Sequence, residues 1–150
     1  MSHLKVGDKI PQFSTIDQNE NTVTQDNLKG KKSVLYFYPK DDTPTCTNQA
    51  CNLRDNYNHL LSEGYAVYGI SPDKAKKHQK FIAKYDLPFD LLVDTEHEIA
   101  DAFGVWGEKT TFGKTYMGIR RTTFVFDENG VITDVIDKVT AKDHTNQIMG

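Results

Sequence analysis

Short apolar runs alternate with segments of helical periodicity along this chain, and this alternation constrains the fold more than any other feature. The run 33–38 is apolar and aromatic, with charged residues before it and Pro39 after it, which predicts a buried central strand. The runs 66–70 and 91–93 predict two further buried strands. Apolar residues recur every three or four positions between the runs, which indicates helices. The pattern therefore predicts an α/β protein.

The first predicted helix covers 46–61. Thr43 and Pro44 supply its start, because proline suits the first helical position and the preceding threonine can cap the free N–H groups. Gly64 marks its end.

Turn residues and caps mark the remaining elements. These remaining elements are an amino-terminal hairpin over 13–23, a helix after Pro72 through about Tyr85, a short helix opened by a capping-box pattern at 95–98 and ending near Gly104, a hairpin of 122–126 with 131–136, and a short last helix over 142–150. We expect a mixed central sheet covered by helices on both faces, with an amino-terminal β-hairpin.

Composition and charge narrow the class of protein. A chain of 150 residues has room for one domain, so we expect a single domain over 1–150. The formal net charge is −3 and basic residues are interspersed with acidic ones, which argues against nucleic acid as a partner. The amino terminus lacks the apolar stretch of a secretory signal, and no apolar run approaches the ~20 residues that span a bilayer. We therefore expect a cytoplasmic protein that does not associate with membranes.

The two cysteines, Cys46 and Cys51, are expected to act chemically, because a reducing compartment does not keep them as a permanent disulfide. Cys46 falls in the first turn of the helix predicted over 46–61, where free N–H groups and the helix dipole stabilise a thiolate. It also begins the apolar stripe, so a small buried hydrophobe is the alternative interpretation. Cys51 lies roughly 140° around the helix and ~7.5 Å along it, on the polar side, where it looks like an ordinary helical cysteine.

The segment around these cysteines resembles the peroxiredoxins, specifically the branch of the bacterioferritin comigratory protein, also called the Q type. The resemblance extends along nearly the whole chain. The matching motifs are Phe37-Tyr38-Pro39-Lys40, Thr43-Pro44-Thr45-Cys46-Thr47 followed by Cys51, Tyr68-Gly69-Ile70-Ser71, the segment 103–109 and the segment 118–124. This combination is specific to the family.

The resemblance implies a thioredoxin-like fold and a thiol peroxidase that reduces hydrogen peroxide and organic hydroperoxides. It implies that Cys46 attacks the peroxide and becomes a sulfenic acid, and that Cys51 then forms a disulfide with it. Thioredoxin or a similar dithiol reductant would recycle this disulfide. We further expect a monomer, and no cofactor is implied.

The resemblance also implies a role for three residues around Cys46. Arg121 matches the family arginine and can stabilise charge on the leaving oxygen, although the neighbouring Arg120 is a second candidate and a surface strand position is the alternative for both. The Thr43 hydroxyl can orient the peroxide, and Pro44 can shield the sulfur from water. Two positions depart from the branch, namely Thr45 in place of the usual Gly and Gln49 in place of the usual Glu.

Other functional classes fit the sequence less well. The segment 107–115 ends in Gly-Lys-Thr like a phosphate-binding loop, but five residues separate its glycines where that loop has four. The five histidines lack the short spacings of a zinc site, so no metal is expected. A thioredoxin-type reductase requires Cys-x-x-Cys. A redox switch or client-binding module that uses the same cysteine pair remains the alternative, because such a protein requires only the thiols.

Overall fold

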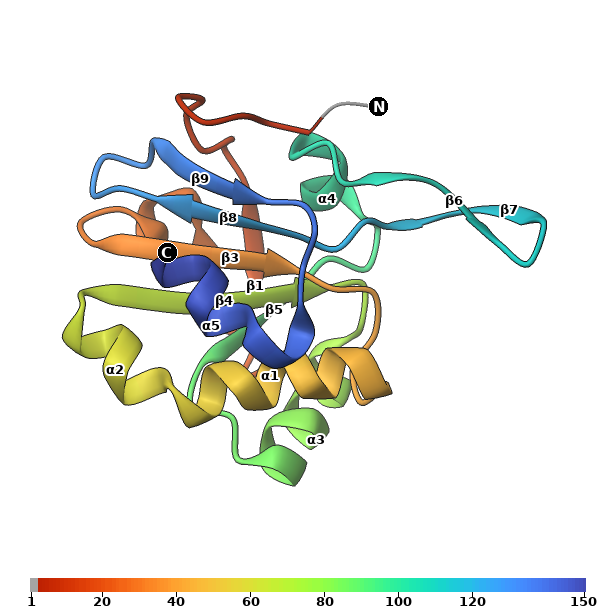
Figure 1. Ribbon diagram of the computed structural model, residues 1–150, viewed down its shortest axis with the longest axis horizontal. Helices are drawn as coiled ribbons and strands as arrows, with labels where there is room; N and C mark the ends of the chain where they lie inside the picture. The colour runs from red at the N-terminus through yellow and green to blue at the C-terminus, as the bar shows by residue number, and fades with distance from the viewer. Residues whose placement is uncertain (1–2) are drawn as a thin grey trace.

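The computed structural model describes residues 3–150, and its central feature is a five-stranded sheet with the order β5-β4-β3-β8-β9 (Figure 1). The strands are β3 Lys32–Phe37, β4 Tyr65–Ser71, β5 Asp90–Val93, β8 Thr122–Phe126 and β9 Ile132–Ile136. β3 pairs in parallel with β4 and antiparallel with β8, so the sheet is mixed as predicted. The run 33–38, predicted as a buried central strand, thus lies at the centre of the sheet.

The two faces of the sheet are covered by different elements. Successive side chains of β3 enter opposite cores, with Val34 and Tyr36 on one face and Leu35 and Phe37 on the other. The first face is covered by α1 Pro44–Asp55, α2 Tyr57–Ser62, α3 Ala75–Tyr85 and α5 His144–Met149. The second face is covered by the predicted amino-terminal hairpin, formed by β1 Ser14–Ile16 and β2 Thr22–Thr24, together with the 3-10 helix η1 Gln25–Leu28 and α4 Glu98–Ala102. In Figure 1, α1 and α5 lie in front of the sheet and β1 behind it. Both faces carry helices as predicted, and those of the second face are short.

The helix predicted over 46–61 is interrupted, which corrects the prediction. α1 begins at Pro44 and ends at Asp55, and α2 begins only at Tyr57. The intervening Asn56 has φ −111° and ψ 11°, and its side-chain amide donates to the Asn52 carbonyl at 2.8 Å. An asparagine side chain that binds the preceding turn competes with the backbone of a continuous helix.

Two predicted helix caps are also wrong. The Thr43 side chain does not cap α1, because its hydroxyl donates instead to the Lys40 carbonyl at 2.9 Å. The capping box predicted at 95–98 does not form at α4. Instead the Asp94 carboxylate accepts the N–H groups of Ile99 and Ala100 at 3.0 and 2.9 Å. A carboxylate upstream of the expected cap reaches these free donors because His97 adopts a left-handed conformation with φ 48°.

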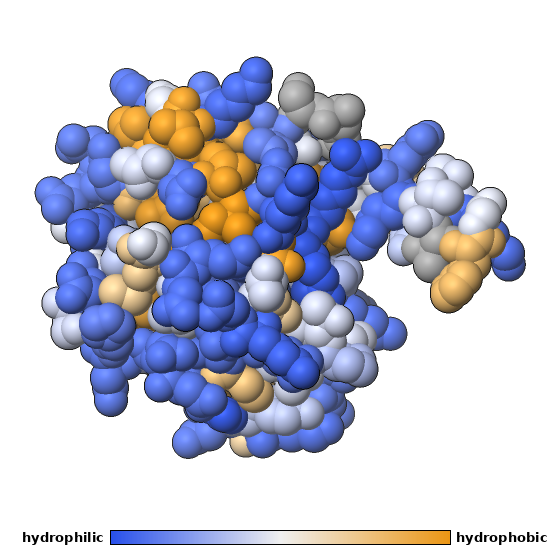
Figure 2. Space-filling view, viewed as in Figure 1, coloured by the Kyte–Doolittle hydropathy of each residue, from blue (hydrophilic) through white to orange (hydrophobic). Residues whose placement is uncertain are grey.

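A further hairpin, which the sequence pattern did not predict, projects from the body of the molecule (Figure 1). It consists of β6 Trp106–Thr111 and β7 Lys114–Ile119. Phe112 and Gly113 turn the chain with φ values of 53° and 77°, as a tight two-residue hairpin requires. Phe112 is fully exposed, and Figure 2 shows apolar atoms at the tip of this arm. The segment that ends in Gly-Lys-Thr therefore forms a hairpin and not a phosphate-binding loop.

The carboxy-terminal 3-10 helix η2 Ala141–Asp143 and α5 dock through the buried His144. Its Nε2 lies 2.8 Å from the Thr123 hydroxyl and its Nδ1 lies 2.9 Å from the Gln147 side-chain oxygen. Burial lowers the pKa of His144 below its ordinary value, because the charged ring is poorly solvated there.

In the part of the chain that the structure describes, no helix has the length and apolar character needed to cross a membrane.

We expect the pKa of His144 to make the free energy of unfolding pH-dependent. The unfolded chain binds a proton at His144 near pH 6.5, while the folded protein resists that proton. The contribution of His144 is therefore complete above about pH 6.5 and is lost as the pH falls below it. Urea unfolding at about pH 7.5 and about pH 5.5 should show a smaller difference in His144→Leu than in the wild type. An equal difference in both proteins would contradict this assignment.

Candidate active site

Cys46 lies at the carboxyl end of the central strand. β3 ends at Phe37, the loop 38–43 follows, and α1 begins at Pro44, so that Cys46 is the third residue of the helix. Its side chain is buried, with 1% exposure. The free N–H groups of the first helical turn and the positive end of the helix dipole both favour a thiolate at this position.

Arg121 contacts the thiol from the neighbouring strand. β8 runs antiparallel to β3 with Thr122 opposite Phe37, so the residue before β8 lies at the same edge of the sheet as the start of α1. Nη2 of Arg121 donates to Sγ of Cys46 at 3.0 Å. Arg120 is directed elsewhere, with its Nη2 donating to the Glu108 carbonyl at 3.0 Å. Of the two candidate arginines, the structure therefore brings only Arg121 to the sulfur.

Gln49 holds the same guanidinium. It lies one helical turn after Cys46, is fully buried, and accepts a hydrogen bond from Nη1 of Arg121 at 3.4 Å through Oε1. Among the residues that the structure describes, its Nε2 has no hydrogen-bond partner. The motif had marked Gln49 only as a departure from the branch, although its i+3 spacing from Cys46 already placed it on the thiol's side of the helix.

Thr43 and Pro44 lie at the junction of the loop and α1. Thr43 is half-buried; its carbonyl accepts the Thr47 N–H at 2.8 Å, and its hydroxyl donates to the Lys40 carbonyl. Pro44 is exposed. Both residues are fixed to the first turn that carries Cys46, at its outer edge.

The loop before α1 is held by a cluster of buried polar side chains that the sequence pattern did not predict. The Asp41 carboxylate contacts the His78 ring at 2.6 Å and accepts the Tyr38 hydroxyl, and all three side chains are buried. Burial and the nearby Asp41 charge raise the pKa of Tyr38 well above its usual value, so this hydroxyl remains a donor. His78 comes from α3 and lies far from Asp41 along the chain. The only signal in the sequence for this buried group was the position of Asp41 shortly after β3.

Cys51 lies on the same helix as Cys46 and is half-buried. The two cysteines are not bonded to each other, and both thiols are free. Helix radius and rise hold α-carbons five residues apart at roughly 8 to 9 Å. A disulfide tolerates only about 4.4 to 6.8 Å between α-carbons. The intact helix α1 therefore keeps the two thiols apart, and a bond between them requires part of the helix to unwind.

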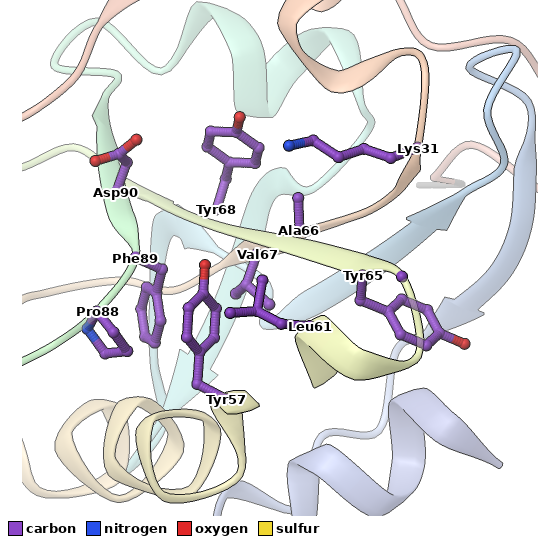
Figure 3. Close-up of a pocket in the computed structure, with 11 residues that line it drawn as sticks. Lys31, Tyr57, Leu61, Tyr65, Ala66, Val67, Tyr68, Pro88, Phe89 and Asp90 are labelled. Carbon is purple, nitrogen blue, oxygen red and sulfur yellow. The ribbon is translucent and has the colours of Figure 1, made fainter. Parts of the chain in front are cut away.

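A pocket of about 410 Å³ lies at the opposite edge of the sheet and contains neither Cys46 nor Arg121. Its walls come from α2, the start of β4 and the segment before β5, and Figure 3 shows Tyr57 and Phe89 side by side in it, with ring centroids 5.9 Å apart. Over residues 3–150, no three His, Cys, Asp or Glu side chains are grouped as a metal site requires. Cys46 and Arg121 thus lie away from this pocket, at the start of α1.

Residues 6–135 match the AhpC/TSA family. The chain is 48% identical over 149 residues to the putative peroxiredoxin bcp of Haemophilus influenzae, covering 99% of this chain and 96% of the relative. It is 44% identical over 146 residues to the peroxiredoxin Bcp of Bacillus subtilis, covering 97% of this chain and 93% of the relative. These relatives match the chain over nearly its whole length.

Solved structures show the same fold. The peroxidoxin BcpB of Mycobacterium tuberculosis superposes with a TM-score of 0.85 at 33% identity, over 97% of this chain and 94% of that one. A cysteine-to-serine mutant of PrxQ from Xylella fastidiosa superposes with a TM-score of 0.91 at 27% identity, over 99% of this chain and 95% of that one. The thioredoxin-like fold that the sequence predicted for this chain is therefore confirmed.

Proposed function

The chain belongs to the AhpC/TSA family, and we propose that Cys46 is the residue with which it attacks hydroperoxides. It is a peroxiredoxin of the Bcp or Q type and therefore a thiol peroxidase. The observation that carries the residue assignment is the contact of 3.0 Å between Arg121 Nη2 and Cys46 Sγ at the start of α1. A redox switch requires the two thiols alone, whereas a peroxidase also requires a group that stabilises the leaving oxygen.

The proposed reaction begins at Cys46. Its thiolate attacks the terminal oxygen of the hydroperoxide, the O–O bond breaks, and the other oxygen leaves as an alcohol, or as water, after it takes up a proton. Cys46 is thereby oxidised to a sulfenic acid. Arg121 contributes a fixed positive charge beside the reacting sulfur, where negative charge moves onto the leaving oxygen. Thr43 and Pro44 would form the side of the peroxide site that faces the loop.

Cys51 completes the cycle in this scheme. Its thiol attacks the sulfur of the Cys46 sulfenic acid, water leaves, and a disulfide forms. A thioredoxin-type dithiol then reduces this disulfide and is itself oxidised. We propose that the chain does this as a monomeric single domain, because one chain provides all of the residues named. We also propose that it acts in the reducing environment of the cytoplasm.

The direct test is stopped-flow consumption of hydrogen peroxide or cumene hydroperoxide with thioredoxin, thioredoxin reductase and NADPH as the recycling system. We expect consumption to continue until the reductant is exhausted. A single equivalent of peroxide consumed per chain, with no recycling by any dithiol, would favour the redox-switch alternative.

We expect disulfide formation to open α1, because the helix keeps the cysteines too far apart to bond. Thr45, Thr47 and Asn48 are weak helix formers, so the first turns open at low cost. Amide exchange over 46–54 should be faster in the oxidised than in the reduced protein. Unchanged exchange in that segment would contradict this mechanism.

The matching variant is Cys51→Ser. Cys46 should then stop at sulfenic acid after one equivalent of peroxide, overoxidise with excess peroxide, and lose turnover with thioredoxin. Mass spectrometry of the oxidised wild type should show an intramolecular link between Cys46 and Cys51. Its absence would mean that an external thiol recycles Cys46.

A further inference from the structure

His78 is a buried histidine that the reaction scheme does not use. It lies on α3 with no solvent exposure, and both ring nitrogens meet oxygen atoms. Nδ1 is 2.6 Å from a carboxylate oxygen of Asp41, and Nε2 is 2.8 Å from the carbonyl oxygen of Leu92. A carbonyl oxygen only accepts, so Nε2 carries a proton. Nδ1 and Asp41 then hold one further proton between them, which gives a buried pair with no net charge.

The other contacts of Asp41 are equally complete. Its second carboxylate oxygen accepts the Tyr38 hydroxyl, and its backbone N–H donates to the Asp73 carboxylate at 2.6 Å. Asp73 also accepts the Ser71 hydroxyl at 3.0 Å at the end of β4. Buried polar networks in which every member is paired are rigid, because each unpaired group would be strongly unfavourable. Asp41 is thus joined to α3 through His78 and to the end of β4 through Asp73.

The next residue adds a second attachment to α3, this time at the surface. The Asp42 carboxylate contacts Lys84 Nζ at 2.8 Å and accepts the Tyr85 hydroxyl at 2.9 Å. Asp42 adopts a left-handed conformation with φ 59°, which non-glycine residues favour only when their surroundings hold it. Two consecutive loop residues are therefore tied to one helix.

We propose that His78 is a positioning residue of the peroxidase reaction, which acts through Asp41 to hold the loop that sets Thr43 and Pro44 beside Cys46. Thr43 follows Asp41 by two residues, so a shift of Asp41 is transmitted directly to the loop side of the peroxide site. Cys46 is held separately, by α1 and by Arg121 on the sheet. Loss of His78 should therefore disturb the peroxide site more than the reactivity of the thiol. This inference rests on the proposed function of Cys46.

The test compares two reactions of the same sulfur in a Cys51→Ser background, where only Cys46 reacts. Oxidation by hydrogen peroxide in stopped flow requires the aligned peroxide site, whereas alkylation by iodoacetamide requires only the thiolate. We expect His78→Leu to slow oxidation about 10-fold or more, since small misplacements of reacting groups have large effects on rate. Alkylation should stay within about 2-fold of the parent.

His144→Leu is the matched control. His144 is also fully buried and also has both ring nitrogens within hydrogen-bond distance of a partner, but it lies on α5 and its hydrogen-bond partners are Thr123 and Gln147, outside the loop 38–43. It should lower stability by a similar amount and leave the ratio of oxidation to alkylation unchanged. The same fall in this ratio in both variants would assign the effect to general loss of stability and would overturn the proposal.

Asp41→Asn provides the conservative rescue. Its amide oxygen can accept the Tyr38 hydroxyl, and its amide nitrogen can donate to Nδ1 of a neutral His78, which keeps the loop in place. We expect oxidation within about 3-fold of the parent for Asp41→Asn and slowing like that of His78→Leu for Asp41→Ala. Equal slowing in both would contradict a positioning role. If His78→Leu fails to fold, this pair decides the question.

Two kinds of failure remain distinguishable. If the parent protein itself shows no oxidation at Cys46, the proposed function is wrong. If the parent reacts and His78→Leu reacts at the same rate, only the role of His78 is wrong.

Discussion

Replacement of Cys46 by serine should reduce peroxide turnover to the background of a thioredoxin-coupled assay. A serine hydroxyl stays protonated near neutral pH, so it cannot attack the O–O bond as a thiolate does. The fold should persist, because the substitution changes one buried atom and the new hydroxyl can still accept the Arg121 hydrogen bond. Circular dichroism should therefore match the wild type.

Cys51→Ser is the control for this experiment. It should still consume one equivalent of peroxide per chain, whereas Cys46→Ser should consume none. Substantial turnover in Cys46→Ser, or the reverse order of the two variants, would exclude Cys46 as the attacking residue.

Arg121→Met should slow the oxidation of Cys46 by about 10²- to 10³-fold, the usual effect of removing one donor from a site of developing negative charge. Methionine retains much of the side-chain volume and removes the cation. Arg121 is the arginine whose Nη2 lies 3.0 Å from the sulfur, so the loss falls on the chemical step. Single-turnover oxidation followed by stopped flow measures it.

Arg120→Met is the matched control, since it removes the same charge from the adjacent position. Arg120 binds the Glu108 carbonyl on the projecting hairpin, and its loss should change the rate by no more than about 3-fold. Equal effects of the two substitutions, or a larger one at Arg120, would reverse the assignment.

The sequence predicted the strands of the central sheet closely, because their buried apolar runs differ sharply from the flanking residues. The strand predicted at 122–126 has those bounds in the structure. Elements that depend on local competition were predicted less well. Asn56 interrupts the helix predicted over 46–61, because its side chain binds a backbone carbonyl of the preceding turn. Asp94 replaces the cap expected at 95–98, because its carboxylate accepts backbone N–H groups at the start of α4.

The projecting hairpin escaped prediction for a different reason. Its second strand, β7, is exposed for most of its length, as with Lys114 and Thr115, and so lacks the alternation of buried and exposed residues that marks a strand on a core. The turn at Phe112 and Gly113 was the available signal.

Cys46 could be placed from sequence alone, because its setting is local: a proline starts the helix, and the thiol lies in the first turn. The resemblance to the peroxiredoxins named Arg121, but Arg120 and Arg121 lie side by side in the short connection before β8, and only the placement of β8 against β3 showed which arginine reaches the sulfur. The pairing of Asp41 with His78 could not be foreseen either. It joins a loop to a helix 37 positions later, and hydrogen bonds between such distant residues exist only once the packing of α3 against the sheet brings them together.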